Sequence, residues 1–314
     1  MGILVPLLVL AGGLTLLMAA ADRFVAGASD LAARLRVPPI VIGAVVLGFG
    51  TSAPELVVST MAAAQHEVDL GLGNIVGSNV ANLTLVLGLA ALIRPIDLPT
   101  GTKRRALVCL VSVALFGYLV QGSASDVDGI VLLGAMVVAL ILMVRMDAEE
   151  VTTPDPIGDG ALGMAWARTV GGLAVTVASA QAVVWAATDV AERVGLAHGF
   201  VGFSLVALGT SLPELVTVVA AARRDESGLI IGSLLGSNVF NSLGVGAGLF
   251  LAGNGVVTDV ALQTWGSVAA VVAAFLVVIF MSVVSRKHIN RLEGVVLLCV
   301  YVVVMAMLAT SAGT

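Results

Sequence analysis

A pattern that occurs twice constrains the fold of this chain more than any other feature. The phrase Gly-Thr-Ser-x-Pro-Glu-Leu occupies residues 50–56 and again 209–215, an offset of 159 residues (209 − 50). The same offset relates Gly-Ser-Asn-Val-x-Asn at 77–82 and at 236–241. Both copies lie inside long apolar stretches, where an ionisable group costs about 2.5–3.5 kcal/mol. The carboxylates, hydroxyls and amides of these phrases are therefore candidates for function.

Composition predicts an all-α polytopic membrane protein. The chain is 59% hydrophobic and 11% charged, with a mean hydropathy of +1.10. A soluble domain cannot hide so much apolar surface, whereas a lipid bilayer can cover it. The net charge is −5 and the 15 Lys and Arg residues form no basic patch, so we expect no nucleic-acid partner.

About 20 mostly apolar residues cross a membrane once, and by this measure the sequence predicts ten transmembrane helices. The predicted spans are 3–33, 38–64, 70–93, 105–121, 127–145, 168–192, 198–222, 228–252, 260–284 and 293–311. The first and sixth are longer than one crossing needs. An acidic linker at 146–167 separates two five-helix repeats, at 1–145 and 168–314.

Basic residues predict the orientation in the cell membrane. Loops after odd-numbered spans hold thirteen Lys and Arg residues, and loops after even-numbered spans hold only Arg193. Because basic loops stay in the cytoplasm, the linker is expected there and both termini outside. Residues 1–21 are interpreted as a first span and not as a signal peptide. Cys109 and Cys299 fall inside spans and are interpreted as small buried hydrophobic residues.

The repeat and the span count together predict inverted halves. Five is an odd number, so the second half enters the membrane from the opposite side. Secondary transporters commonly use this arrangement, with the substrate site near the midplane between the halves. The offset of 159 also relates Asp30 to Asp189, Arg34 to Arg193, and Gly43 to Gly202.

The second and seventh spans are expected to be broken helices. Pro54 and Pro213 lack an amide hydrogen and clash with the preceding turn. The backbone carbonyls that they free are tolerated at this depth only where they line a cavity or bind something. Glu55 and Glu214 follow the prolines directly, and hydroxyls precede them. The freed carbonyls near Gly48 and Ala207, and the hydroxyls of Thr51, Ser52, Thr210 and Ser211, complete an oxygen-only set, which hard cations such as Ca²⁺ and Na⁺ prefer.

The third and eighth spans add further polar groups. Ser78 and Asn82 are four residues apart, as are Ser237 and Asn241, so each pair lies on one helix face. Glycines on the same face permit close approach to the broken helices: Gly73, Gly77, Gly232 and Gly236.

Charge balance suggests how such a site works. Two carboxylates carry a formal charge of −2, which one Ca²⁺, or two or three Na⁺ ions, can neutralise. The empty site is costly in a medium of low dielectric constant. We therefore expect the protein to change sides when loaded and to cross poorly when empty, which makes exchange obligatory.

At these residues the chain resembles the sodium/calcium exchanger family of the calcium/cation antiporter superfamily, over essentially its whole length. The resemblance implies antiport of Na⁺ against Ca²⁺ without a cofactor or an enzymatic reaction. It places the central acids at Glu55 and Glu214. It also implies ligation by Thr51, Thr210, Ser78, Ser237, Asn82 and the carbonyls near Gly48 and Ala207.

Some positions depart from the family pattern or refine it. Some prokaryotic members carry Asp at the position of Asn241. The first half reads Gly73-Asn74 where the second reads Gly232-Ser233. Proton-coupled relatives typically carry an Asn-Ala-Thr-Glu type of phrase, so the Thr-Ser-x-Pro-Glu of this chain favours sodium. The linker has no room for the large regulatory domain of animal exchangers.

Several alternatives stay open at this point. A proton- or potassium-coupled antiporter belongs to the same class of protein. A channel is disfavoured because channels usually build filters by oligomeric symmetry. An enzyme is disfavoured because His66, His198 and His288 lie near span ends, away from the carboxylates. We expect alternating access in which the first and sixth spans move. A monomer is expected to suffice, and the oligomeric state is left open.

Overall fold

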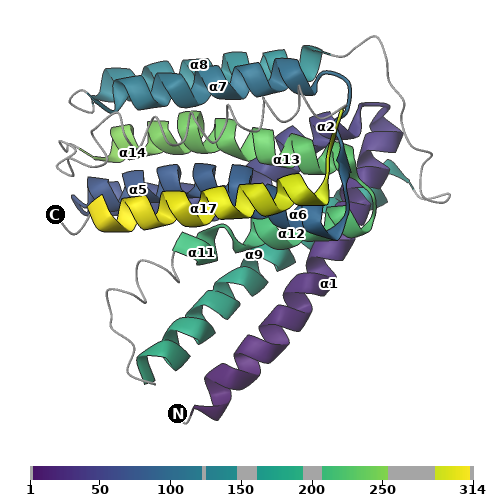
Figure 1. Cartoon of the computed structure of the whole chain (residues 1–314), viewed down its shortest axis with the longest axis horizontal. Coiled ribbons are helices and arrows are strands. Elements are labelled where there is room, and N and C mark those ends of the chain that lie inside the picture. The colour runs from purple at the N-terminus through teal and green to yellow at the C-terminus, as the bar shows by residue number, and fades with distance from the viewer. Residues whose placement is uncertain (1–2, 122–124, 147–160, 194–206, 254–286, 312–314) are drawn as a thin grey trace.

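The computed structural model describes residues 3–121, 125–146, 161–193, 207–253 and 287–311 (Figure 1). Nearly all of the described chain is helical, as the composition predicts. Lipid offers no hydrogen bonds, and a helix satisfies its backbone groups internally, so helices suit an apolar chain of this kind.

The two longest described helices are α1 (Leu4–Leu35) and α9 (Leu162–Arg193), with 32 residues each. Both exceed the length of one crossing, as the sequence predicts. Helix α9 begins six residues before its predicted start at 168, so the end of the predicted linker is helical. Arg168 marks the predicted start of the span but lies inside α9, because arginine is a good helix former. Both helices lie obliquely to the others and project from one side of the molecule (Figure 1).

The second predicted span is broken, as expected. It consists of α2 (Pro39–Ile42), the π-helical turn η1 (Gly43–Gly48), α3 (Phe49–Thr51) and α4 (Ala53–Ala64). The axis bends by 42° between α3 and α4, at Ser52. The seventh span is interrupted in the same way at Ser211, between α11 (Ala207–Thr210) and α12 (Leu212–Arg223). In both cases the second helix resumes with proline in its first turn, where the missing amide hydrogen costs little.

The third and eighth spans each contain a wide turn. The third consists of α5 (Val68–Ala81), η2 (Asn82–Val86) and α6 (Leu87–Ile93), and the eighth of α13 (Ser227–Val239), η4 (Phe240–Val245) and α14 (Gly246–Ala252). In the π-helical turns η2 and η4 the hydrogen bonds reach five residues back, which bulges the helix locally and often marks functional sites. The sequence pattern did not predict these turns, and they carry Asn82 and Asn241.

The other described elements are α7 (Thr102–Leu119), α8 (Asp126–Arg145), α17 (Arg291–Ser311) and the strands β1 (Ile96–Asp97) and β2 (His288–Ile289). The strands pair antiparallel, with Ile96 opposite Ile289, and join the chain before α7 to the chain before α17. The buried Arg105 donates from Nη2 to the carbonyl of Met143 at 2.9 Å. This bond ties the start of α7 to the end of α8.

Element boundaries repeat at the offset found in the sequence. Helices α12 and α14 begin and end 159 residues after α4 and α6. The residues that follow α4 and α12 also share a backbone conformation. His66 and Asp225 are both left-handed, with φ of 64°. The next amides, of Glu67 and Glu226, close the last helical turn at 2.8 and 3.0 Å. The two halves thus share local structure as well as sequence.

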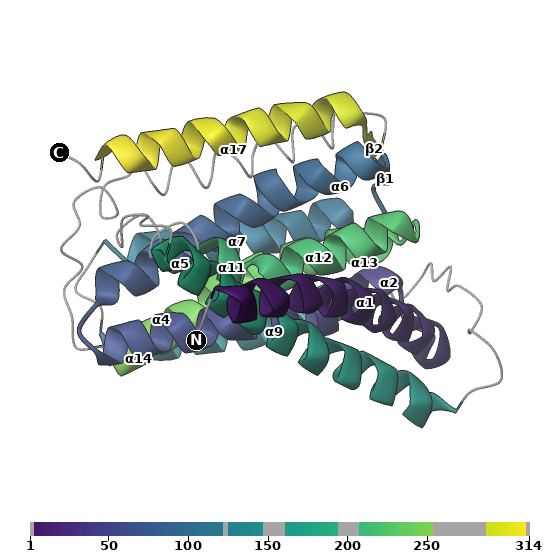
Figure 2. The same ribbon diagram turned by 90° about the horizontal axis from the view of Figure 1, so that it is seen from below.

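Helices α1 and α9 pack against each other in opposite directions (Figure 2). A Cβ built on Gly13 would lie 3.0 Å from Val183 Cγ2, and one on Gly27 would lie 2.8 Å from the amide nitrogen of Thr169. Residue numbers therefore rise along one helix as they fall along the other. Because the two helices hold equivalent places in the repeat, inverted halves require this arrangement.

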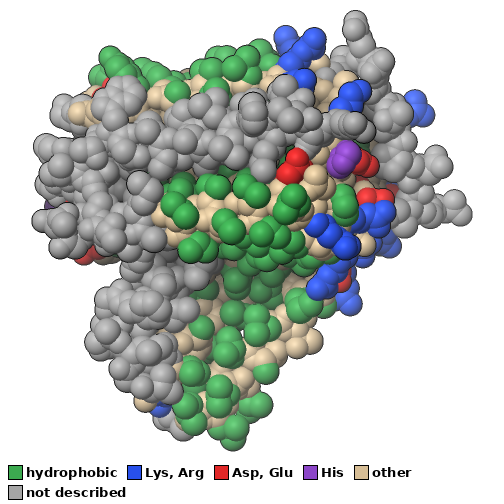
Figure 3. Space-filling model, viewed as in Figure 1, with side chains coloured by type: hydrophobic (Ala, Val, Ile, Leu, Met, Phe, Trp, Pro, Cys, Tyr) green, Lys and Arg blue, Asp and Glu red, His purple; other side chains and the backbone are tan. Residues whose placement is uncertain are grey.

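The outer surface suits a bilayer. Five described helices are long and apolar enough to cross a membrane, or six with the bent helix at 39–64. Large side chains such as Leu8, Ile130 and Val138 are exposed on them. Lys and Arg side chains gather at one end of these helices (Figure 3). The predicted count of ten spans stays a prediction, because residues 254–286 and 194–206 lie outside the described part of the chain.

Candidate ion-binding site

Glu55 and Glu214 lie in the first turns of α4 and α12, directly after the helix breaks. Their exposures are 0% and 1%. No Lys or Arg forms an ion pair with either residue in the described part of the chain. The two acids that the sequence singled out are therefore buried at equivalent places inside the helix bundle.

Each carboxylate is bonded to the serine at the break of the other half. Ser52 Oγ donates to Glu214 Oε1 at 2.7 Å. Ser211 Oγ donates to Glu55 Oε1 at 3.3 Å. Each serine stands three residues before the glutamate of its own half, so the starts of α4 and α12 face each other. The fold thus brings these four predicted site residues together.

The electrostatics of this arrangement favour a bound cation. Glu55 and Glu214 are close enough that their ionised forms repel each other. The starts of α4 and α12 direct partial positive charge toward the carboxylates, but such helix ends offset only part of the charge. The second oxygen of each carboxylate, Oε2, is buried and has no hydrogen-bond partner among the described residues. Both oxygens are therefore available as ligands.

Each of the two threonines beside the breaks donates a hydrogen bond. Thr51 Oγ1 donates to the carbonyl of Leu47 in its own helix, at 2.8 Å. Thr210 Oγ1 donates to Asn74 Oδ1 at 3.1 Å, and Asn74 Nδ2 donates to Ser59 Oγ at 3.0 Å. Both threonines are buried, as predicted. At the position equivalent to Asn74, the second half has Ser233.

The serines of the third and eighth spans reach the broken helices. Ser78 Oγ accepts a hydrogen bond from Ser211 Oγ at 3.3 Å. The Ser211 hydroxyl also bonds to Glu55, so it links Ser78 to that carboxylate. Ser237 Oγ donates to the carbonyl of Gly48 at 3.0 Å. The same carbonyl also accepts a hydrogen bond from the amide of Ser52, at 3.4 Å. The equivalent carbonyl belongs to Ala207, the first residue of α11.

Glycines let α13 approach η1 and α2 at backbone distance. A Cβ built on Gly236 would lie 2.2 Å from the carbonyl oxygen of Ala44, and one on Gly232 would lie 2.2 Å from that of Ile40. The flat helix face predicted from the glycine spacing is confirmed in this half. For Gly73 and Gly77 the equivalent partner segment lies at 199–203, outside the described residues.

Two predicted amides lie on the wide turns. Asn82 in η2 and Asn241 in η4 are 1% and 0% exposed. Neither amide has a hydrogen-bond partner among the described residues. Leaving a buried polar group unsatisfied costs about 1–3 kcal/mol, so these amides are strong candidates for contacts to an ion.

The fold adds polar residues that sequence reasoning missed. Asn79 Nδ2 donates to Ser242 Oγ at 3.0 Å, from one half to the other. Asn238, the equivalent of Asn79, is buried with both amide atoms unpartnered among the described residues. The repeated phrase contains both asparagines and could have identified them. Asn74 carried no such signal, because the repeat is broken at its position.

The chemistry of these ligands suits hard cations. Carboxylate, hydroxyl, amide and carbonyl oxygens are the ligands that Na⁺ and Ca²⁺ prefer. Within the described ranges no group of three or more His, Cys, Asp or Glu side chains could hold a metal ion. A transition-metal site of the zinc type is therefore not found in that part of the chain.

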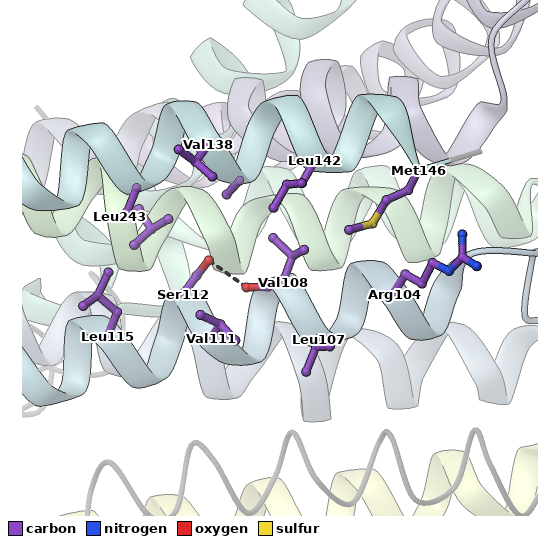
Figure 4. Close-up of a pocket in the computed structure, with 12 residues that line it drawn as sticks. Arg104, Leu107, Val108, Val111, Ser112, Leu115, Val138, Leu142, Met146 and Leu243 are labelled. Atoms are coloured by element: carbon purple, nitrogen blue, oxygen red, sulfur yellow. Dashed lines mark hydrogen bonds between the residues drawn. The ribbon is translucent and has the colours of Figure 1, made fainter. Parts of the chain in front are cut away.

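A groove between α7 and α8 is of a different kind (Figure 4). Its volume is about 460 Å³, and mainly apolar side chains such as Leu107 and Val111 line it. The hydroxyl of Ser112 is bonded to the carbonyl of Val108 in its own helix, at 2.8 Å. Arg104 stands at one end of the groove (Figure 4). These residues supply few oxygen ligands for a cation, so the groove is not a second candidate ion site.

Comparison with known proteins decides the family. The family model described as sodium/calcium exchanger protein matches residues 5–145 and 164–310. The chain belongs to the sodium/calcium exchanger family. The exchanger is accordingly a multi-pass membrane transporter of the cation antiporter type, and not an enzyme. The resemblance inferred from the repeated phrases is thereby confirmed.

Individual relatives match the exchanger over nearly its whole length. The CaxA protein of Alkalimonas amylolytica is 35% identical over 309 residues, covering 92% of this chain and 94% of the relative. The sodium/calcium exchanger MaX1 of Methanosarcina acetivorans is 30% identical over 349 residues, covering 98% and 99%. A solved structure of the sodium-calcium exchanger NCX_Mj, soaked with 10 mM Na⁺, superposes with a TM-score of 0.86 at 30% identity, covering 97% and 99%.

Proposed function

We propose that this exchanger moves Na⁺ and Ca²⁺ in opposite directions through one shared site between Glu55 and Glu214. The observation that carries the proposal is the reciprocal bonding of each carboxylate to the serine of the other half. It makes a single site from the two repeats. The names of MaX1 and NCX_Mj, both sodium/calcium exchangers, support the same pair of ions.

The proposed ligands are the side-chain oxygens of the two repeated phrases and two backbone carbonyls. They belong to Glu55, Glu214, Thr51, Thr210, Ser52, Ser211, Ser78, Ser237, Asn82, Asn241, Gly48 and Ala207. Two carboxylates at −2 are balanced by one Ca²⁺ or by several Na⁺ ions. Because an uncompensated pair of buried charges is strongly destabilising, the empty site resists the crossing and exchange is obligatory.

The transport step is proposed to be alternating access between inverted halves, residues 1–145 and 168–314, joined by a cytoplasmic linker with both termini outside. Helices α1 and α9 are the moving pair. Their antiparallel packing and oblique course relative to the other helices support this division. Structures of NCX_Mj are described in terms of extracellular ion exchange and induced occlusion of the binding site, which fits such a cycle.

Protons or potassium are the alternative coupling ions. The neutral amide of Asn241 stands where some family members carry a carboxylate, so the side chains of this site supply two negative charges and not three. A different charge at this corner can change which monovalent cation fits. The transport experiment below therefore compares sodium, proton and potassium gradients.

The test uses purified exchanger in sealed vesicles. Calcium uptake is expected to require an outward sodium gradient. Replacement of Glu55 or Glu214 by Gln is expected to reduce uptake at least about 100-fold, because each carboxylate supplies half of the charge that binds Ca²⁺. Asp126→Asn is the matched control: this exposed carboxylate at the start of α8 is expected to leave uptake within about twofold.

Two outcomes would overturn the proposal. Uptake driven equally well by a pH gradient or a potassium gradient without sodium would assign a different coupling ion. Full activity of both glutamine variants would remove the carboxylate pair from the transport site.

A further inference from the structure

Equivalent ion pairs are buried at one end of the molecule and exposed at the other. In α1, Asp30 Oδ1 and Arg34 Nε are 2.9 Å apart, and their side chains are 2% and 14% exposed. In α9, the equivalent Asp189 and Arg193 are 2.6 Å apart and 26% and 38% exposed. The two ends share this pair in sequence and differ in packing.

At the buried end a hydrogen bond joins α1 to the rest of the bundle. Ser29 Oγ donates to Glu226 Oε1 at 2.5 Å, across 197 residues of sequence. Glu226 lies at the corner between α12 and α13. The adjacent Asp225 forms an ion pair with Arg94 just after α6, at 2.6 Å. Ser29 thus holds α1 to a corner that is itself fixed to other helices of the bundle.

Among the described residues, the equivalent contact at the other end is not made. The offset of 159 relates Ser29 to Thr188 in α9, and Glu226 to Glu67 at the corner between α4 and α5. The residue types are kept, since Thr188 offers a hydroxyl and Glu67 offers a carboxylate. Glu67 is exposed, however, and in the described part of the chain no hydrogen bond joins it to Thr188.

We propose that Ser29–Glu226 and Thr188–Glu67 are two gating contacts that form alternately during exchange. The proposal rests on the alternating-access function above. Inverted halves can exchange their roles, so a contact made at one end in one state is made at the other end in the opposite state. Two contacts of similar chemistry also keep the two states close in free energy.

The positions of the gating contacts indicate toward which side of the membrane this conformation is closed. The closed end carries Ser29, and α1 finishes there beside the basic residues that predict the cytoplasmic side. The open end carries Thr188. The structure therefore corresponds to the state in which the ion site is closed toward the cytoplasm.

Chemical crosslinking tests the closed contact. In a Cys109→Ala/Cys299→Ala background, Ser29→Cys with Glu226→Cys is treated with a short cleavable bis-methanethiosulfonate. A linker is needed because a direct disulfide requires Cα atoms within about 7 Å, and glutamate is longer than cysteine. Crosslinking is expected to reduce sodium-driven calcium uptake at least about 20-fold, and a reductant is expected to restore it.

A second pair at the same end is the matched control. Arg94→Cys with Asp225→Cys joins two parts of the bundle that do not include α1 or α9. Its crosslink is expected to leave uptake within about twofold. Full uptake with the Ser29–Glu226 crosslink in place would overturn the proposal.

The open contact is tested without measuring transport. The rate of crosslinking between Thr188→Cys and Glu67→Cys reports how often the opposite state forms. Ser29→Ala removes a hydrogen bond to a carboxylate, so this rate is expected to rise about tenfold, whereas Ser29→Thr keeps the hydroxyl and the original rate. An unchanged rate in folded Ser29→Ala protein would overturn the gating contacts alone. Loss of sodium-driven uptake in the unmodified protein would count against the proposed function instead.

Discussion

At the scale of single residues, the two carboxylates are held unequally. Ser52 donates its one hydroxyl hydrogen to Glu214 at 2.7 Å. Ser211 lies 3.3 Å from both Glu55 and Ser78, and one hydrogen cannot serve both acceptors fully. The bond from Ser211 to Glu55 is therefore weaker than the bond from Ser52 to Glu214, although the sequence around both acids is nearly the same.

Amide substitutions distinguish ion ligands from structural residues. Asn82 has no hydrogen-bond partner among the described residues, so Asn82→Leu is expected to leave the thermal stability of the ion-free protein unchanged or raised. The stabilisation that added Ca²⁺ gives to the unmodified protein is expected to be lost. Thermal unfolding with and without Ca²⁺ measures both effects.

Asn74→Leu is the matched comparison. The Asn74 amide bonds to Thr210, Ser59 and the carbonyl of Glu55, at 3.1, 3.0 and 3.4 Å. Its loss is expected to destabilise the ion-free protein by about 2–4 kcal/mol, because several buried groups lose their partner together. Equal destabilisation by both leucine variants would mean that Asn82 is a structural residue.

At the scale of elements, backbone contact between α13 and the broken helix positions the site. Helix α13 carries Ser237, whose hydroxyl reaches the carbonyl of Gly48 only because Gly232 and Gly236 have no side chain in between. In membranes, small residues stabilise helix pairs by allowing this approach. The same glycines therefore serve both packing and the geometry of the site.

A methyl group at this contact is expected to be costly. In Gly236→Ala the new Cβ would meet the carbonyl oxygen of Ala44 at 2.2 Å, which forces the backbones apart. We expect a loss of about 1–3 kcal/mol in stability, together with weaker Ca²⁺ binding. Gly134→Ala on the exposed face of α8 meets no described atom within 4 Å and is expected to be neutral or stabilising by up to about 1 kcal/mol. Thermal unfolding of the two variants checks this difference, and equal stabilities would contradict it.

At the scale of the whole molecule, charge distribution supports the proposed orientation. Lys and Arg side chains gather at one end of the long helices (Figure 3), and the exposed faces between the ends are apolar. Basic residues are retained on the cytoplasmic side of a membrane. The end that carries Arg94, Arg104 and Arg223 is therefore the proposed cytoplasmic end.

Labelling of single cysteines checks this orientation. In a background without Cys109 and Cys299, Gln65→Cys after α4 is expected to react with a membrane-impermeant maleimide added to intact cells. Thr100→Cys before α7 is expected to react only after the membrane is opened. Both positions are exposed, so access to solvent does not distinguish them. The reverse pattern of labelling would invert the proposed topology.

Much of the site could be predicted from local sequence. Pro54 and Pro213 predicted the helix breaks, because the missing amide hydrogen acts within one turn. The burial of Glu55 and Glu214 followed from their apolar surroundings. The wide turns η2 and η4 could not be predicted, since no residue type forces them. They alter the helical register at Asn82 and Asn241, which a regular spacing of four residues could not anticipate.

By itself, the sequence determined that this chain enters a membrane, that it is built from two related halves, and which acids lie at depth. These properties depend on composition and on residues close together in the chain. Only the tertiary structure decided that Ser52 donates to Glu214, that Ser211 donates to Glu55, and that Ser29 donates to Glu226. Such contacts join residues more than 150 positions apart, so they depend on which helix faces meet, and nearly identical phrases can meet different neighbours.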